Sequence, residues 1–166
     1  MTRRTPTHHA VRVQRLLAST SSAGKRRPYA AGMLSLGGSL LIFLGLYFVF
    51  VRPALLPEDA RFIGRSMAQL QSEVPRLRLW TRHVLWVLGG FMFASGVMTC
   101  YVAVTSFRAR ARGSASVVAL SGLTSIGAMT AVNVVIDSDF QWLLLAFAVP
   151  WVLALVLYRT DTGVTP

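Results

Sequence analysis

The chain has 166 residues, of which 54% are hydrophobic and only 14% are charged, and it carries a formal net charge of +11. A soluble globular domain has about 25% charged residues, so this composition excludes an ordinary soluble domain and predicts an integral membrane protein. The cations stand beside long apolar runs, which favours lipid headgroups over nucleic acid as their partner. The single cysteine, Cys100, excludes an intramolecular disulfide.

Residues 1–27 hold seven Lys and Arg, two His and no acid. This composition predicts a basic, largely disordered tail that attracts anionic headgroups. Val13, Leu16 and Leu17 share one helical face, so we expect a short interfacial helix within it. The same composition is typical of a mitochondrial transit segment, which leaves the mitochondrial inner membrane as an alternative location.

Four uncharged, mostly apolar runs follow, at residues 28–51, 84–107, 113–136 and 140–158. A helix needs roughly 20 apolar residues to cross a hydrocarbon core of about 30 Å, so each run predicts a transmembrane helix. The first run is longer than a signal-peptide core and lacks a small-residue cleavage site, which favours an uncleaved anchor. We therefore expect an all-α integral membrane protein, with one membrane domain over 28–159 and a short tail over 160–166.

The long loop between the first two runs has the pattern of an amphipathic helix over residues 57–74. Pro57 suits the first helical position, and Glu58 and Asp59 favour the positive end of the helix dipole. Apolar residues then follow at helical spacing: Ile63, Met67, Leu70 and Val74. We expect this helix to lie on the membrane surface or over the top of the bundle.

The other two links are short, which makes consecutive helices antiparallel neighbours. If the N-terminus lies inside, the inner segments hold eleven Lys and Arg and the outer segments six. Because Lys and Arg accumulate on the cytoplasmic side, we expect both termini to be cytoplasmic. Sixteen of the seventeen basic residues are Arg, which indicates a GC-rich genome and favours the bacterial plasma membrane.

The four runs contain no Asp, Glu, Lys, Arg or His, the usual marks of proton relays, ion pathways and haem ligation. We therefore expect no enzyme activity, cofactor or metal. Small residues recur at four-residue spacing, as at Gly96 and Cys100, and this pattern favours close helix packing. Pro150 predicts a kink in the fourth run.

The most distinctive polar residues cluster on the expected outer face. Ser138 and Gln141 fit a capping box for the fourth helix. Asp137 ends the third helix, where the dipole disfavours an anion, so we expect it to pair with an arginine of the long loop and pin the loop helix over the bundle. The candidate network comprises Asn133, Asp137, Asp139, Glu58, Asp59, Arg52 and Arg61. The alternative is a cation or headgroup site made by the four acids of this set.

These patterns predict a small multi-pass protein of non-catalytic type, acting as an accessory, scaffold or assembly subunit of a membrane complex. Its docking surfaces would be the basic tail and the loop helix, and its partner another membrane protein or a second copy of itself. The alternative is a small oligomeric transporter or channel lined by Ser, Thr and Asn133. A membrane enzyme ranks third, because no catalytic set is visible.

Overall fold

A computed structural model describes residues 29–160, which contain helices and turns but no strand. Four helices are long and apolar enough to cross a membrane, as the sequence predicts. The first is α2 (Tyr29–Phe50), and the second joins α5 (Leu77–Val102) to a π-helical turn, η1 (Ala103–Phe107). The third joins α6 (Ser114–Gly122), a second π turn η2 (Leu123–Gly127) and α7 (Ala128–Val135), and the fourth is α8 (Gln141–Thr160).

The second long helix begins at Leu77, seven residues before the predicted start at Val84. Arg78, Arg82 and His83 therefore belong to its first turns, because a charged side chain ends an apolar run without ending a helix. The predicted N-terminal tail, its short helix and the end of the C-terminal tail lie outside the described residues.

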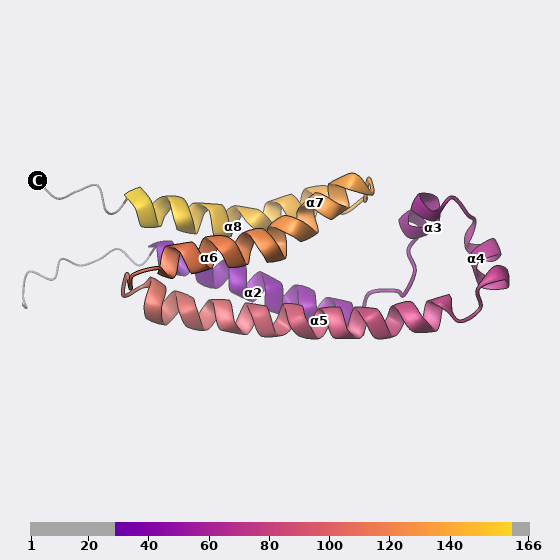
Figure 1. Ribbon diagram of the computed structural model, residues 1–166, viewed down its shortest axis with the longest axis horizontal. Helices are drawn as coiled ribbons and strands as arrows, with labels where there is room; N and C mark the ends of the chain where they lie inside the picture. Colours follow the sequence, from indigo (N-terminus) through magenta and orange to yellow (C-terminus); the bar gives the residue numbers. More distant parts are fainter. Residues whose placement is uncertain (1–28, 161–166) are drawn as a thin grey trace, which may run out of the picture.

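The long helices run antiparallel to their neighbours, with α2 and α5 side by side (Figure 1). The helix α8 packs against α2, and α6 and α7 pack against α8. Two short helices, α3 (Pro57–Ile63) and α4 (Met67–Glu73), lie beyond one end of the bundle, which we call the loop end (Figure 1). The opposite end, with the turn around Arg110, we call the closed end.

The long loop forms two short helices instead of the single predicted helix over 57–74. The first begins at Pro57 as predicted and ends at Gly64, whose φ of 75° is left-handed and costs glycine little. A new helix starts at Ser66, whose hydroxyl accepts the Gln69 N–H while the Gln69 side chain accepts the Ser66 N–H. Leu70 is buried, whereas Ile63, Met67 and Val74, from the same predicted apolar face, are exposed.

The bundle core lies mainly toward the closed end. Leu34, Phe107, Val118 and Ala154 are buried there together with Trp151. The Trp151 ring fits between two helices because it meets glycines, Gly37 of α2 and Gly122 of α6, where any larger residue would collide with it. Toward the loop end the buried core is smaller, and consists of Leu44, Met92 and Leu144.

Two pairs of facing glycines hold α2 against α5. A Cβ on Gly96 would lie 2.6 Å from the carbonyl oxygen of Gly38, and one on Gly45 would lie 2.6 Å from that of Gly89. The pairs are two helical turns apart on both helices, so the backbones touch over much of their length. Such close approach supports helix association in lipid, where van der Waals packing replaces the hydrophobic effect.

This packing predicts that alanine changes the free energy of unfolding differently at two glycines of α5. Gly96→Ala should lower the free energy of unfolding by about 1–3 kcal/mol, because its Cβ must push the α2 backbone away. Gly90→Ala is the control: no atom lies within 4 Å of its Cβ position, so its higher helix propensity should leave stability unchanged or raise it by up to about 1 kcal/mol. Unfolding of the purified protein by SDS in mild detergent measures both, and equal losses would contradict the packing account.

Candidate functional site

A cavity of about 850 Å³ lies between the loop-end halves of the four long helices. All four long helices contribute residues to its wall. The lining residues fall within 41–52 (α2 and the turn after it), 85–95 (α5), 124–136 (η2, α7 and the turn after it) and 140–147 (the first half of α8 and the turn before it). Most lining side chains are apolar, including Phe43, Phe48, Phe91, Met129 and Phe147. The loop closes its end with Arg52, Leu56 and Glu58.

The cavity exists because the helices separate toward the loop end. The glycine pairs keep α5 on α2, while the third long helix diverges from α5 between α6 and α7 (Figure 1). The third long helix also widens into the π turn η2 where it meets the cavity. Such π turns are frequent at functional sites in helical proteins.

The polar side chains in the wall bond mainly within their own helices. Thr124 donates its hydroxyl proton to the Leu120 carbonyl oxygen, and Ser125 donates to the Ser121 carbonyl oxygen. The Asn133 side-chain amide donates to the Met129 carbonyl oxygen at 2.9 Å. Because these donors are already used, the wall presents a largely apolar surface to the cavity.

A buried carboxylate fastens the loop to the opposite hairpin. Glu58, near the start of α3, is only 5% exposed. It accepts the Ser138 hydroxyl proton at 3.1 Å and the Asp139 N–H at 2.9 Å. We call this set, Glu58 with Ser138 and Asp139, the Glu58 clasp. Charge-assisted hydrogen bonds of this kind are about twice as strong as neutral ones, so the clasp ties α3 to the turn between α7 and α8.

The turn between α7 and α8 offers these donors because of how α7 ends. Asp137 has a φ of 51°, a left-handed conformation that Asp tolerates better than most residues. The Ser138 N–H then reaches the Asn133 carbonyl oxygen and the Asp137 N–H reaches that of Val134, the two bonds of a Schellman motif. This closure leaves the Ser138 hydroxyl and the Asp139 N–H free for Glu58, close to the positive N-terminal end of α8.

Two details expected of this turn are wrong. Arg61 reaches the turn, but it donates to the backbone carbonyl of Asp137 at 3.1 Å, and its carboxylate partner is Asp139 at 3.3 Å. The left-handed backbone at Asp137 exposes its carbonyl oxygen, so the backbone takes the role predicted for its side chain. The capping box is not formed either, because the Ser138 hydroxyl accepts the Phe140 N–H at 3.2 Å and donates to Glu58.

A second pair of the candidate network meets at the other side of α3. The Arg52 guanidinium lies 3.8 Å from the Asp59 carboxylate, and 5.2 Å from the centre of the Phe48 ring. Asp59 also accepts the Leu56 N–H at 2.7 Å, which closes the first turn of α3. The structure thus brings together Arg52 with Asp59, and Glu58 with the turn before α8. The Asn133 side chain bonds to Met129 of its own helix.

The alternative cation site does not form within residues 29–160. The carboxylates of Glu58, Asp59 and Asp139 bind arginines or N–H and O–H donors, and Asp137 is contacted through its backbone carbonyl. No three acids, histidines or cysteines in the described part of the chain are placed to hold a metal. Pro150 lies buried within α8, which continues from Gln141 to Thr160. The kink predicted there stays a prediction.

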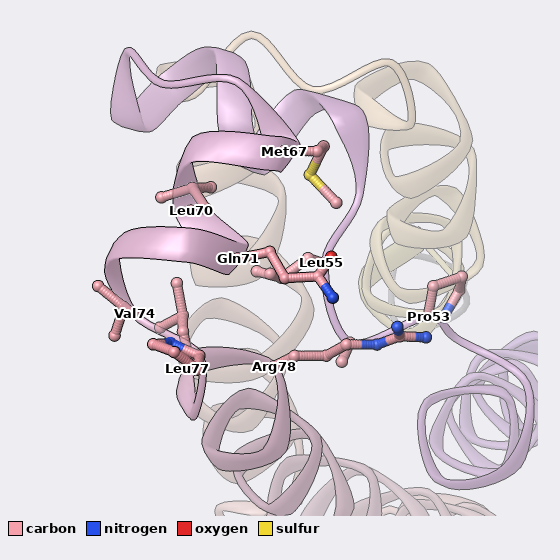
Figure 2. A pocket seen from close by; sticks show the side chains of 10 residues that line it. Pro53, Leu55, Met67, Leu70, Gln71, Val74, Leu77 and Arg78 are labelled. Carbon is pink, nitrogen blue, oxygen red and sulfur yellow. The ribbon is translucent and has the colours of Figure 1, made fainter.

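A smaller hollow of about 210 Å³ lies beneath α4 (Figure 2). Leu55, Met67, Leu70 and Val74 line it from the loop, and Leu77 and Arg78 line it from the start of α5. Figure 2 shows the Arg78 side chain extending across toward Pro53. The helix α4 also packs against α5, which gives the loop a second attachment in addition to the Glu58 clasp.

The clasp predicts that Glu58 and Ser138 act together on stability. Glu58→Ala should cost about 2 kcal/mol in the free energy of unfolding, because it leaves a hydroxyl and an N–H without their charged acceptor. Ser138→Ala should cost less, and the double variant should show a coupling of about 1 kcal/mol. SDS unfolding in mild detergent gives all three values.

Glu73→Ala is the matched control, because Glu73 lies on the same loop and its pair with Arg65 is exposed at both ends. It should change the free energy of unfolding by no more than about 0.5 kcal/mol. If Glu58→Ala were as mild as this control, or if the two clasp variants were additive, the clasp would have no energetic role.

Comparison with known proteins finds no match to a protein-family model, to a curated protein or to a solved structure. The part that the sequence did not predict is the cavity. Its lining residues come from four helices and carry no motif, so only their packing brings them together.

Proposed function

We propose that this protein is a non-catalytic accessory or assembly subunit of a membrane complex, and that it docks its partner with the loop. The observation that carries this proposal is the exposure of large apolar side chains on a loop that is fastened in place. Phe62 is 64% exposed, Ile63 is 50% exposed and Trp80 is 64% exposed. Phe62 and Ile63 end α3, and Trp80 lies in the first turn of α5.

Three contacts fix the position of this surface. The Glu58 clasp and the Arg61–Asp139 pair join α3 to the turn before α8, and buried Leu70 anchors α4 near the start of α5. An apolar surface held rigidly loses little conformational entropy when a partner covers it. Phe62 and Ile63 are neighbours in α3, and an exposed apolar patch outside a hydrocarbon core marks a site of association with protein or membrane. We assign it to a partner membrane protein whose own loops reach the same depth.

The proposed location is the bacterial plasma membrane, with both termini cytoplasmic and the loop end outside. The excess of Lys and Arg in the segments assigned to the inside supports this orientation. In it, the basic residues 1–27 meet the anionic cytoplasmic leaflet. Trp80 then lies at the outer headgroup region, where tryptophan is enriched.

A second candidate is the small oligomeric transporter or channel. The cavity favours it, since Ser95, Thr124, Ser125 and Asn133 all contribute to the wall. The hydrogen bonds weigh against it, because the hydroxyl donors of Thr124 and Ser125 and one N–H of Asn133 are bonded within their helices, so the wall offers a solute few groups in exchange for its water. We therefore rank it below the accessory subunit.

The docking proposal predicts a discrete, stoichiometric hetero-complex in the native membrane. Native mass and composition of the complex extracted in mild detergent should show one partner membrane protein at fixed ratio. The double variant Phe62→Ser with Ile63→Ser should lose that partner, because it removes two exposed apolar anchors without touching the clasp. Arg65→Gln, a change on the same loop that breaks only an exposed ion pair, should retain it.

A homo-oligomer that lacks any partner and carries solute flux in liposomes would contradict the docking proposal and support the transporter. Retention of the partner by the double variant would also contradict it. Equal loss of the partner in the double variant and in Arg65→Gln would show a general disturbance of the loop and reject the assigned surface.

A further inference from the structure

We propose that the large cavity binds one molecule of an anionic phospholipid, with its acyl chains between the helices and its phosphate on Arg52. The juxtaposition behind this proposal is an apolar cavity, open between two helical hairpins, with a nearly buried arginine at one end. The inference goes beyond the proposed docking function, which concerns the outer surface of the loop.

The length of the cavity matches one leaflet of a bilayer. Along α2 it runs from Leu41 to Arg52, which is about 16 Å at 1.5 Å per residue. Along α5 it runs from Leu85 to Ser95, about 15 Å by the same rise. Half of a hydrocarbon core of about 30 Å is about 15 Å. Since Leu41 stands near the middle of α2 and Arg52 just after its end, the cavity spans the depth from the bilayer centre to the headgroups.

The lining suits hydrocarbon chains. A volume of about 850 Å³ lies within the range of about 300–1,000 Å³ typical of ligand cavities. Leucine, phenylalanine and methionine side chains form most of the wall, and the hydroxyl groups of Thr124 and Ser125 are directed to their own helix carbonyls. Methionines such as Met92 and Met129 are flexible, which lets a wall adapt to chains of varied shape.

Arg52 supplies the N–H donors that a phosphate headgroup requires, and it shares its positive charge with Asp59, 3.8 Å away. Its side chain is only 14% exposed, yet its guanidinium carries five N–H donors. Among the described residues it gives one hydrogen bond, to the Pro53 carbonyl oxygen at 3.3 Å, and lies 3.8 Å from Asp59, beyond hydrogen-bonding distance. Donors therefore remain for a phosphate, which an arginine fork binds in bidentate fashion.

The other charged residue in the wall does not cancel this site. Glu58 also lines the cavity, but the Ser138 hydroxyl and the Asp139 N–H bind its carboxylate. An apolar helix of a partner protein in the same cavity would leave the spare Arg52 donors without acceptors, and buried unpaired donors are costly. The unused donors of Arg52 thus favour a phosphate-bearing lipid over an apolar helix as the occupant.

Lipid titration followed by native mass spectrometry tests the proposal on the full-length protein in mild detergent. Dipalmitoyl phosphatidylglycerol should bind one molecule per chain at least about tenfold more tightly than dipalmitoyl phosphatidylcholine, whose headgroup has no net charge. Arg52→Gln should remove this difference, while Arg65→Gln, at an exposed arginine of the same loop, should keep it.

A second pair of variants tests the chains independently of the charge. Ala128→Trp places an indole into the cavity from α7 and should weaken binding of both lipids by at least about tenfold. Ala131→Trp, three residues farther along the same helix and outside the cavity lining, should leave both affinities unchanged. Thermal midpoints of all four variants without added lipid identify any variant that fails to fold. The pair of variants that still folds then tests the proposal.

Several results would overturn the proposal. Equal affinity for the two lipids in the unsubstituted protein would exclude a phosphate site at Arg52 selective for anionic lipid. Undiminished lipid binding in Ala128→Trp would place the lipid outside the cavity. Competition by inorganic phosphate as strong as that of the lipid would show an ion site without a role for acyl chains. Co-purification of a partner helix that blocks lipid binding would assign the cavity to protein.

Discussion

A single buried carboxylate joins the two hairpins of this protein at the loop end. Glu58 comes from the loop that continues the α2–α5 hairpin, and its acceptor oxygens meet the turn that joins α7 to α8. Burial of a charge is costly unless donors surround it, so the position of Glu58 depends on the Ser138 hydroxyl and the Asp139 N–H. The cavity end and the orientation of α3 depend on this contact, which the Arg61–Asp139 pair and buried Leu70 supplement in holding the loop.

The clasp matters because the rest of the packing is uneven. Facing glycines bring α2 and α5 into backbone contact, and toward the closed end Gly37 of α2 and Gly122 of α6 make room for the Trp151 ring of α8. Toward the loop end only a small core of Leu44, Met92 and Leu144 bridges the hairpins. A bundle packed this way resists opening at one end and depends on polar contacts at the other. Binding of lipid or of a partner is therefore expected at the loop end.

The sequence predicts the four long helices because hydropathy is a local property that neighbouring residues share. It misplaces the start of the second, since Arg78 and Arg82 end the apolar run but not the helix. It joins α3 and α4 because the apolar spacing continues across Gly64, where a left-handed backbone stops the helix. The sequence predicts an arginine contact with the Asp137 side chain, because a residue pattern does not reveal the left-handed φ that turns the Asp137 backbone carbonyl toward Arg61. The cavity and the glycine contacts depend on which helices pack together. The sequence of a single apolar run does not contain that information.

The most direct test of the clasp is the distance between the loop and α8, measured by pulsed electron paramagnetic resonance. Spin labels at Arg65→Cys and Trp142→Cys, in a Cys100→Ser background, place the probes on exposed positions on either side of the clasp. The account predicts one narrow distance distribution in the otherwise unsubstituted protein in bilayers, and a broad one after Glu58→Ala. Distributions of the same width with and without the Glu58 carboxylate would contradict it.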